Sequence, residues 1–390
     1  MKPESQNQPA FPPELLSSSY EQKVAHFHDK TISHEAIEIA MKRLLEAIED
    51  ALPDSLIFIY GPSGVGKSTL LRRAEAKIVE RLLPLLEDDL EMVPVARVQL
   101  ATLGKRGFSW SDTYRRLLDS LNEPLIEHKI IPRSKLPEGG ISPYRMSEEK
   151  YRISYESALI HRRPQVVMLD DGHHLNKVGA ARLLNQLDCL KTIAGQTNVP
   201  HALCGTYELL TLRNLSGQLG RRSIDIHFPR YKFDDEGQKH FVAALKTFQA
   251  HMPVNDPPDL VSHFDYLMER SAGCIGVLKD WCEWALVRAL REGARTVSIE
   301  HFEKTTFSND ILAKLLMEIS EGEKRLEDSG SSYSLHLKQL READSGNKAE
   351  TPANPGEEKQ KSKPVHKSKP GQRNPARDPI VDPALCAPKA

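Results

Sequence analysis

The sequence predicts an α/β fold with a parallel five-stranded sheet flanked by helices, followed by a smaller all-helical domain. Three observations lead to this prediction. A short apolar segment, Leu56–Tyr60, runs directly into a glycine-rich loop and a helical pattern. Further short apolar segments alternate with helical patterns, an order typical of parallel sheets covered by helices. After Tyr231 only helical patterns follow, which indicates a second domain of another class.

The individual strands and helices follow from the spacing of apolar residues. The expected strands comprise residues 56–60, 93–100, 165–170, 200–206 and 224–228. The helices expected in the α/β part comprise residues 33–52, with Thr31 or Ser33 as the cap, then 67–86, 110–121 and 183–193. The helices expected in the all-helical part comprise one capped by Asp234, then residues 257–271, 276–292 and 299–320. Residues 131–143 are rich in Pro and Gly and are expected to form a loop.

Composition divides the chain into two domains and two tails. Residues 1–18 are polar and proline-rich, and we expect a disordered leader. The α/β domain, with an N-terminal helix, is expected over residues 19–231, and a helical lid domain over 232–320. Residues 321–390 are expected to be a disordered, basic tail, because residues 355–377 hold seven Lys or Arg against two Glu, interleaved with Pro and Ser.

Charge and cysteine content limit the classes of function. The chain has 390 residues and a net charge of −1, so any surface that binds nucleic acid must be local. Its five cysteines show no paired spacing, which fits a reducing cytoplasm. The first residues lack the features of a signal peptide, and no apolar run approaches the length of a membrane span. We therefore expect a soluble, cytoplasmic protein without a membrane partner.

The glycine-rich loop carries the most specific motif in the chain. Residues Gly61–Ser68 read GPSGVGKS and match the pattern G-x-x-x-x-G-K-[ST] in full, between a strand and a helix. Glycines let main-chain amides turn towards phosphates, and the start of the helix adds its positive dipole. The expected ligands are ATP and Mg²⁺, with Lys67 on the β- and γ-phosphates and Ser68 on the metal. The residues expected to hold the nucleotide are Gly61, Pro62, Ser63, Gly64, Val65, Gly66, Lys67, Ser68 and Thr69.

Two carboxylates end the third expected strand, in the stretch PQVVMLDDGHHL. In phosphate-loop ATPases such an acid holds the magnesium, and the next residue orients the attacking water. We therefore assign Asp170 to Mg²⁺ and Asp171 to the water, with a helix cap as the alternative for Asp171. His173 and His174 are expected to be polar loop residues or sensors of the phosphate state, since adjacent histidines seldom both reach one metal ion.

Three further positions are candidates for contact with the nucleotide. Thr206 ends the fourth strand and can place a hydroxyl near the γ-phosphate, or it can cap the next helix. Arg221 and Arg222 precede the fifth strand, where they can reach the phosphate of a neighbouring subunit or form a solvated surface pair. Lys279 lies at the start of a helix in the second domain and can reach back to the nucleotide, or it can be an ordinary exposed lysine.

Taken in order, these motifs resemble those of an AAA+ ATPase, and more narrowly the TniB/TnsC-type ATPases of transposons, including those of CRISPR-associated transposons. The stretches that carry the resemblance are GPSGVGKS, VVMLDD, LCGTYEL, QLGRRSIDIHF and GCIGVLKDW, within residues 20–310. The resemblance implies an AAA+ phosphate-loop fold and an ATP-dependent regulator of DNA transposition. Such a protein assembles as a ring or helical filament on double-stranded DNA and links a TniQ- or TnsD-like target selector to the transposase.

The resemblance also implies roles for single residues. Asp170 corresponds to the Walker B acid, Thr206 to the first sensor, Arg221 or Arg222 to the arginine finger, and Lys279 to the second sensor. Asp171 stands where the family usually has glutamate, so we expect hydrolysis that is slow or stimulated by assembly or DNA. Lysine at position 279 replaces the more common arginine.

DNA contact is expected on the loop after the second strand and on the helix that follows it. The stretch LGKRGFSW carries Lys105 and Arg106, and Arg115 and Arg116 lie on the next helix. Repeated along an assembly, these cations would follow the phosphates of double-stranded DNA without reading its bases. A solvated basic loop is the alternative.

Three functions are consistent with the sequence. The first is the transposition regulator, and the second is an AAA+ replication initiator or helicase loader, which a DNA-binding domain beyond the lid would favour. The third is a non-catalytic scaffold that polymerises on ATP binding. Ring or filament, subunit number, RNA- or protein-guided target choice and the partner of the basic tail stay open at this point.

Overall fold

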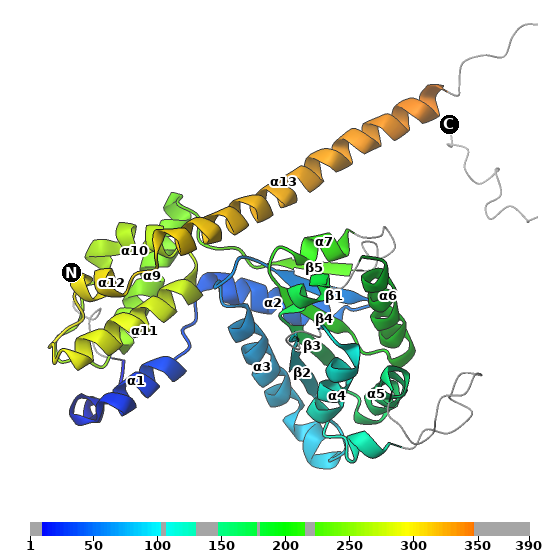
Figure 1. The fold of residues 1–390 in the computed structure, drawn as a ribbon, viewed down its shortest axis with the longest axis horizontal. Coiled ribbons are helices and arrows are strands. Elements are labelled where there is room, and N and C mark those ends of the chain that lie inside the picture. Colours follow the sequence, from blue (N-terminus) through cyan, green and yellow to red (C-terminus); the bar gives the residue numbers. More distant parts are fainter. Residues whose placement is uncertain (1–9, 103–106, 130–146, 178–179, 215–222, 347–390) are drawn as a thin grey trace, which may run out of the picture. The chain divides into compact units, whose positions relative to one another are not determined.

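The sheet has the predicted parallel, five-stranded architecture. The computed structural model describes residues 10–102, 107–129, 147–177, 180–214 and 223–346 (Figure 1). All neighbouring strands are parallel, in the order β2-β3-β4-β1-β5. The strands are β1 (Leu56–Tyr60), β2 (Val95–Gln99), β3 (Val166–Asp170), β4 (His201–Gly205) and β5 (Ser223–His227). Because the strands run in one direction, the residues that follow β1, β3 and β4 lie at the same edge of the sheet.

Helices cover both faces of the sheet, so the α/β part has three layers. Alternate strand residues point to opposite faces, with Ile57 and Ile59 packing on one side and Phe58 on the other. The first face is covered by α2 (Glu35–Glu49) and α3 (Lys67–Asp88). The second face is covered by α4 (Trp110–Ser120), α5 (Glu148–Arg162), α6 (Ala180–Thr197) and α7 (Leu209–Arg213).

Helix α5 has no counterpart in the elements expected from the sequence. Its inward face carries Lys150 and Ser154, both buried, among apolar residues such as Tyr155 and Leu159. Two polar residues on the packed face weaken the apolar periodicity by which a helix is recognised.

The second core is all-helical, as expected after Tyr231. It comprises α9 (Asp235–His251), α10 (Phe264–Arg270), α11 (Ile275–Arg291) and α12 (Ile299–Thr305). Its centre includes Trp281, whose indole N–H donates to the carbonyl of Phe302 at 3.0 Å. Helix α1 (Tyr20–Asp29) also belongs to this core, because Phe27 is fully buried within it.

Both chain ends contain more regular structure than the composition suggested. The short 3₁₀-helix η1 (Pro13–Ser17) lies in the expected leader, and Phe11 before it is buried. The helix expected over residues 299–320 is interrupted after Thr305, and α13 (Asn309–Gly346) continues well past residue 320. Residues 1–330 form one compact unit and residues 331–390 a second.

Local details of α2 also differ from the expectation. Its N-cap is His34, and neither Thr31 nor Ser33 takes that place. Ser33 instead hydrogen-bonds the Glu38 carboxylate. Leu52, the last residue of the expected helix, is 74% exposed because the helix ends at Glu49.

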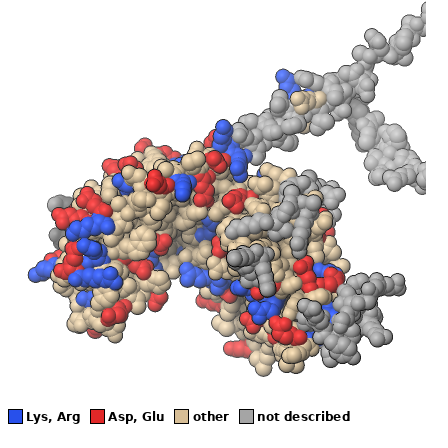
Figure 2. Space-filling model, in the orientation of Figure 1, with Lys and Arg blue, Asp and Glu red and all other residues tan. Residues whose placement is uncertain are grey.

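The described surface carries both signs of charge. On the face shown in Figure 2, Lys and Arg are interspersed with Asp and Glu, in keeping with the net charge of −1. Among the described residues, no helix is long and apolar enough to cross a membrane.

We predict that acid destabilises the fold through His201. This ring is fully buried, with Nδ1 2.9 Å from the Val199 carbonyl and Nε2 2.7 Å from the Tyr155 hydroxyl, and burial lowers its pKa from 6.5 to about 4. Between these two values the unfolded chain binds a proton that the folded chain does not, so stability falls as pH drops. From about pH 7.5 to about pH 5 the loss attributable to His201 is about 2 kcal/mol.

Urea unfolding at the two pH values measures this loss. In His201→Gln, which keeps polar atoms but does not titrate, the drop in unfolding free energy should be smaller by about 2 kcal/mol. An equal drop in both proteins would show that His201 is not the titrating group.

Candidate nucleotide-binding site

The glycine-rich loop connects β1 to α3 and is held close to the backbone of its neighbours. Gly64 and Gly66 have φ values of +73° and +110°, which other residues rarely adopt. A Cβ atom at Gly61 would lie 2.1 Å from the carbonyl oxygen of Phe228. The glycines of the motif are therefore required by this turn, and α3 begins with Lys67 immediately after it.

The loop borders a cavity of about 510 Å³ that brings most of the predicted residues together. The predicted residues that line it are Ser63, Gly64, Val65, Gly66, Lys67, Ser68, Thr69, Asp170, Asp171, Thr206 and Lys279. Gly61 and Pro62 are not among the lining residues, but their carbonyls contact Lys67. The cavity is also lined by the connection between α1 and α2, including Lys30 and Ile32, which the sequence did not indicate.

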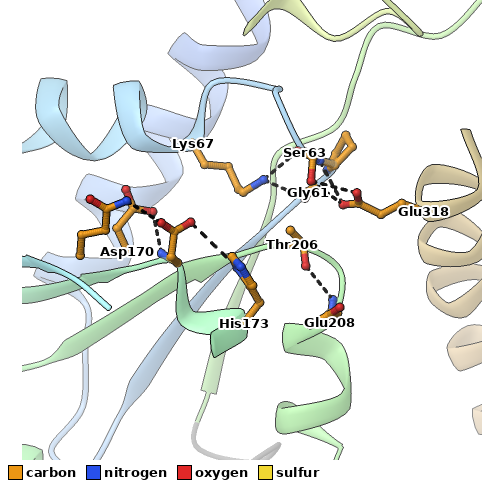
Figure 3. A network of polar contacts seen from close by, with 11 residues as sticks. Gly61, Ser63, Lys67, Asp170, His173, Thr206, Glu208 and Glu318 are labelled. Atoms are coloured by element: carbon orange, nitrogen blue, oxygen red, sulfur yellow. Dashed lines mark hydrogen bonds and ion pairs between the residues drawn. The ribbon is translucent and has the colours of Figure 1, made fainter. Parts of the chain in front are cut away.

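Lys67 is turned back onto its own loop. Its Nζ donates to the carbonyls of Gly61 at 3.0 Å and Pro62 at 2.7 Å (Figure 3). Burial lowers the pKa of this ammonium, while Cys204, Glu318 and Asp170 favour its charged form. If a phosphate group bound here, Lys67 would exchange two neutral carbonyl partners for an anion.

The two acids of β3 lie beside the loop. Asp170 is buried, and its Oδ1 accepts the main-chain N–H of Asp171 at 2.9 Å. Asp171 has a left-handed φ of +55°, and its carboxylate accepts a hydrogen bond of 2.7 Å from the side-chain amide of Gln99. His173 Nδ1 lies 3.9 Å from the same carboxylate. Gln99 is the last residue of β2 and lies opposite Asp170. A polar residue at the end of an apolar strand was the sequence feature that could have identified Gln99 as part of the site.

Thr206 follows β4 at the same edge. Its hydroxyl accepts the N–H of Glu208 at 3.4 Å, so it stabilises the turn before α7 while it also lines the cavity. Both interpretations of Thr206 from the sequence are therefore compatible with its position.

Oxygen ligands suitable for magnesium lie within the cavity. Ser68 and Asp170 both line it, and Mg²⁺ binds few protein oxygens while keeping several waters. Over the described residues there is no cluster of three or more His, Cys, Asp or Glu side chains that could hold a metal ion by themselves. The residues thus fit a magnesium ion that is bound together with phosphate.

Helix α11 of the all-helical part contacts the loop directly. The carbonyl of Gly64 accepts the N–H of Val277 at 3.0 Å, and Val277 lies in the first turn of α11, where helix N–H groups lack partners within the helix. A Cβ at Gly276 would lie 2.4 Å from that carbonyl oxygen. Gly276 therefore permits α11 to approach the phosphate loop, which explains the second glycine in GCIGVLKDW.

Lys279 has another partner in this structure. Its ammonium donates to the Phe27 carbonyl and lies 3.7 Å from the centroid of the Phe27 ring. The side chain therefore fixes α1 to the lid at the wall of the cavity, and it is not an ordinary exposed lysine.

The remaining predicted cations lie apart from the cavity or outside the described residues. Lys105, Arg106, Arg221 and Arg222 are outside them. Arg115 and Arg116 are exposed on α4, but both pair with Asp112, at 3.4 Å and 2.6 Å. The positive charge of α4 is therefore partly neutralised locally.

The glycine-rich loop, the two acids of β3 and Thr206 thus lie at one edge of an α/β sheet. Residues 51–212 match the family model described as an AAA domain. The chain has an AAA+ P-loop fold. No curated protein sequence matches it.

Several solved structures resemble this AAA+ fold. The Aeropyrum pernix ORC2 protein in its ADPNP-ADP complexes is 16% identical, with a TM-score of 0.45 over 69% of this chain and 65% of that chain. The Aeropyrum pernix ORC1 protein in complex with DNA is 18% identical, with a TM-score of 0.46 over 75% and 68%. CDC6P from Pyrobaculum aerophilum is 14% identical, with a TM-score of 0.46 over 74% and 73%. This chain thus spans slightly less than two thirds of the first of these proteins.

We predict that Gly276→Ala destabilises the protein by roughly 1–3 kcal/mol. Alanine favours an isolated helix over glycine by about 1 kcal/mol, so the helix alone would be stabilised. The overlap with the Gly64 carbonyl should outweigh this gain, because that backbone is fixed by the loop. Urea unfolding measures the difference, with Arg288→Ala on the exposed side of α11 as the control. A gain in stability for Gly276→Ala would contradict the tight contact.

Proposed function

We propose that this protein binds ATP together with Mg²⁺ and hydrolyses it slowly. The observation that supports the proposal is the convergence of Lys67, Ser68, Asp170, Asp171 and Thr206 on one cavity. A phosphate loop, a metal-binding acid and a second acid next to it are the parts that phosphoryl transfer to water requires.

The residues then have separate roles. Loop amides and Lys67 hold the phosphates, and Ser68 and Asp170 hold Mg²⁺, which supplies charge neutralisation at the phosphates. Asp171 accepts a proton or hydrogen bond from the attacking water, and Gln99 holds its carboxylate in place. Because Gln99 occupies one carboxylate oxygen and aspartate is one methylene shorter than glutamate, we expect a low basal rate. Arg221 or Arg222 would act on the phosphate of a neighbouring subunit.

At a finer level we propose a regulator of DNA transposition of the TniB/TnsC type. Support comes from the order of the motifs, in particular GTYEL followed by QLGRRS and by the lid stretch GCIGVLKDW. In this function ATP-bound subunits would assemble as a ring or filament on double-stranded DNA. The assembly would connect a TniQ- or TnsD-like selector to transposase subunits, and the basic segment 355–377 would bind DNA or the transposase.

An AAA+ replication initiator or helicase loader is the second candidate. The similar structures include an ORC1 protein in complex with DNA and a Cdc6 protein, but the similarity concerns the fold alone. A DNA-binding domain beyond the all-helical part would favour this candidate. The described part of the segment that follows is helix α13.

We predict that hydrolysis depends on Lys67 and Asp171 in different ways. Lys67→Ala should weaken ATP binding roughly tenfold to a hundredfold, because a charged hydrogen-bond donor is lost. Asp171→Asn should keep binding but lower phosphate release about a hundredfold or more. ATP binding and phosphate release, each measured with and without duplex DNA, separate the two effects. If wild type releases phosphate no faster than Lys67→Ala, both with and without DNA, the protein does not hydrolyse ATP. The non-catalytic, nucleotide-gated scaffold would then be the remaining function.

We predict that Lys105 and Arg106 supply sequence-independent DNA contacts. Replacing both with alanine should weaken duplex binding and reduce the slope of log K against log salt by about 1.8 per subunit, since two phosphate contacts are lost. Arg115→Ala together with Arg116→Ala is the comparison, with a smaller effect expected because Asp112 already pairs with both. An unchanged salt dependence in the first variant would remove Lys105 and Arg106 from the DNA surface.

A further inference from the structure

Helix α13 places a carboxylate on the phosphate loop. Glu318 Oε1 accepts the main-chain N–H of Ser63 at 3.1 Å and its hydroxyl at 3.0 Å, and Oε2 lies 2.8 Å from the hydroxyl (Figure 3). Ser63 is the third residue of the motif and lines the cavity. Both of its donors are thus engaged by an anion that comes from residue 318, far along the chain.

This carboxylate is held firmly on both sides along α13. Ile319 is buried with Ala272 and Cys274 of the lid. Glu323 makes two hydrogen bonds with Arg230, at 3.0 Å and 3.1 Å. These contacts fix the rotation of the helix and direct Glu318 towards Ser63.

A second contact places α13 next to Thr206. A Cβ at Gly322 would lie 2.1 Å from the Tyr207 ring, so α13 packs directly on the residue after Thr206. Helix α13 therefore touches the site at the phosphate loop and at the end of β4.

Charge determines how Glu318 acts on a bound nucleotide. Main-chain amides of a phosphate loop attract anions, and here one of them already holds a carboxylate. Glu318 is not among the residues that line the cavity, and its carboxylate contacts the site through Ser63. The third phosphate of ATP adds negative charge at the loop. This charge and the Glu318 carboxylate on Ser63 repel each other. A diphosphate lacks that charge.

We infer that Glu318 is a specificity-determining residue that weakens ATP binding relative to ADP, and that a bound triphosphate releases α13 from Ser63. This inference rests on the proposed binding of nucleotide at the loop. By thermodynamic linkage, a partner that binds α13 and holds it away from Ser63 raises the affinity for ATP. Bound ATP raises the affinity for that partner by the same factor.

The test compares Glu318→Gln with Glu321→Gln in the full chain. Glu318→Gln removes the charge but keeps a side-chain oxygen that can accept hydrogen bonds from Ser63, whereas Glu321 is exposed and pairs with the exposed Arg325 at 3.9 Å. Calorimetry with Mg²⁺ and either ADP or a non-hydrolysable ATP analogue gives both affinities. In Glu318→Gln the ATP analogue should bind about tenfold more tightly, and the affinity for ADP should change less than about twofold. Glu321→Gln should match wild type.

Hydrogen exchange of wild-type α13 is the second measurement, because it needs no variant. The ATP analogue should raise amide exchange around residues 309–327, and ADP should not. If Glu318 had a purely structural role, Glu318→Gln would change the stability of the protein but not the ratio of its affinities for ATP and ADP.

The outcomes separate this inference from the proposed function. Nucleotide binding with the same ATP-to-ADP ratio in all three proteins, and no difference in α13 exchange, would overturn the inference alone. A wild-type protein that binds neither nucleotide would overturn the proposed function, and the inference with it.

Discussion

The structure of the site depends on the close backbone contacts of the phosphate loop. On one side Gly61 lies against the carbonyl of Phe228, and on the other the carbonyl of Gly64 caps the N–H of Val277. Neither glycine has room for a Cβ, and Gly276 adds the same requirement from the lid. At Gly61 and Gly276 the nearest atom is a backbone carbonyl oxygen, which no side-chain rearrangement can move away. At Gly64 the nearest atom belongs to the Val277 side chain, and the left-handed φ of +73° adds the requirement for glycine. The position of the lid is consequently coupled to the shape of the loop.

Within this frame, the polar groups of the site already have partners in the protein. Lys67 donates to two loop carbonyls, Ser63 donates to Glu318, and Asp171 accepts from Gln99. A nucleotide must therefore exchange existing hydrogen bonds for new ones, and only the surplus appears as affinity. Asp171 likewise has one carboxylate oxygen engaged by Gln99, which in the proposed function holds the carboxylate in place. For the proposed function, this arrangement predicts both a low nucleotide affinity and a low basal rate of hydrolysis.

The sequence predicted those parts of the site that short motifs encode. The phosphate loop is local, and Asp170 could be placed because a parallel sheet brings strand ends to one edge. Gln99 and Glu318 were missed for different reasons. Gln99 required the pairing of β2 with β3. Glu318 lies within the helix expected over residues 299–320, but no local pattern indicated that this helix contacts the phosphate loop. Helix α13 is anchored by few residues, such as Ile319 and Gly322, which produce no clear apolar stripe.

Three elements that are distant in the sequence meet at this loop or at the wall of its cavity. Helix α1 is fixed through the contact of Phe27 with Lys279, α11 through Val277 on Gly64, and α13 through Glu318 on Ser63. Each contact joins the loop or its cavity wall to an element that also packs in an apolar cluster, through residues such as Phe27 and Ile319. Regulation by assembly requires such a connection, because a ligand shifts a conformational equilibrium only by its differential affinity for the two states. In the proposed function, the contacts of the loop would supply that difference at the nucleotide site itself.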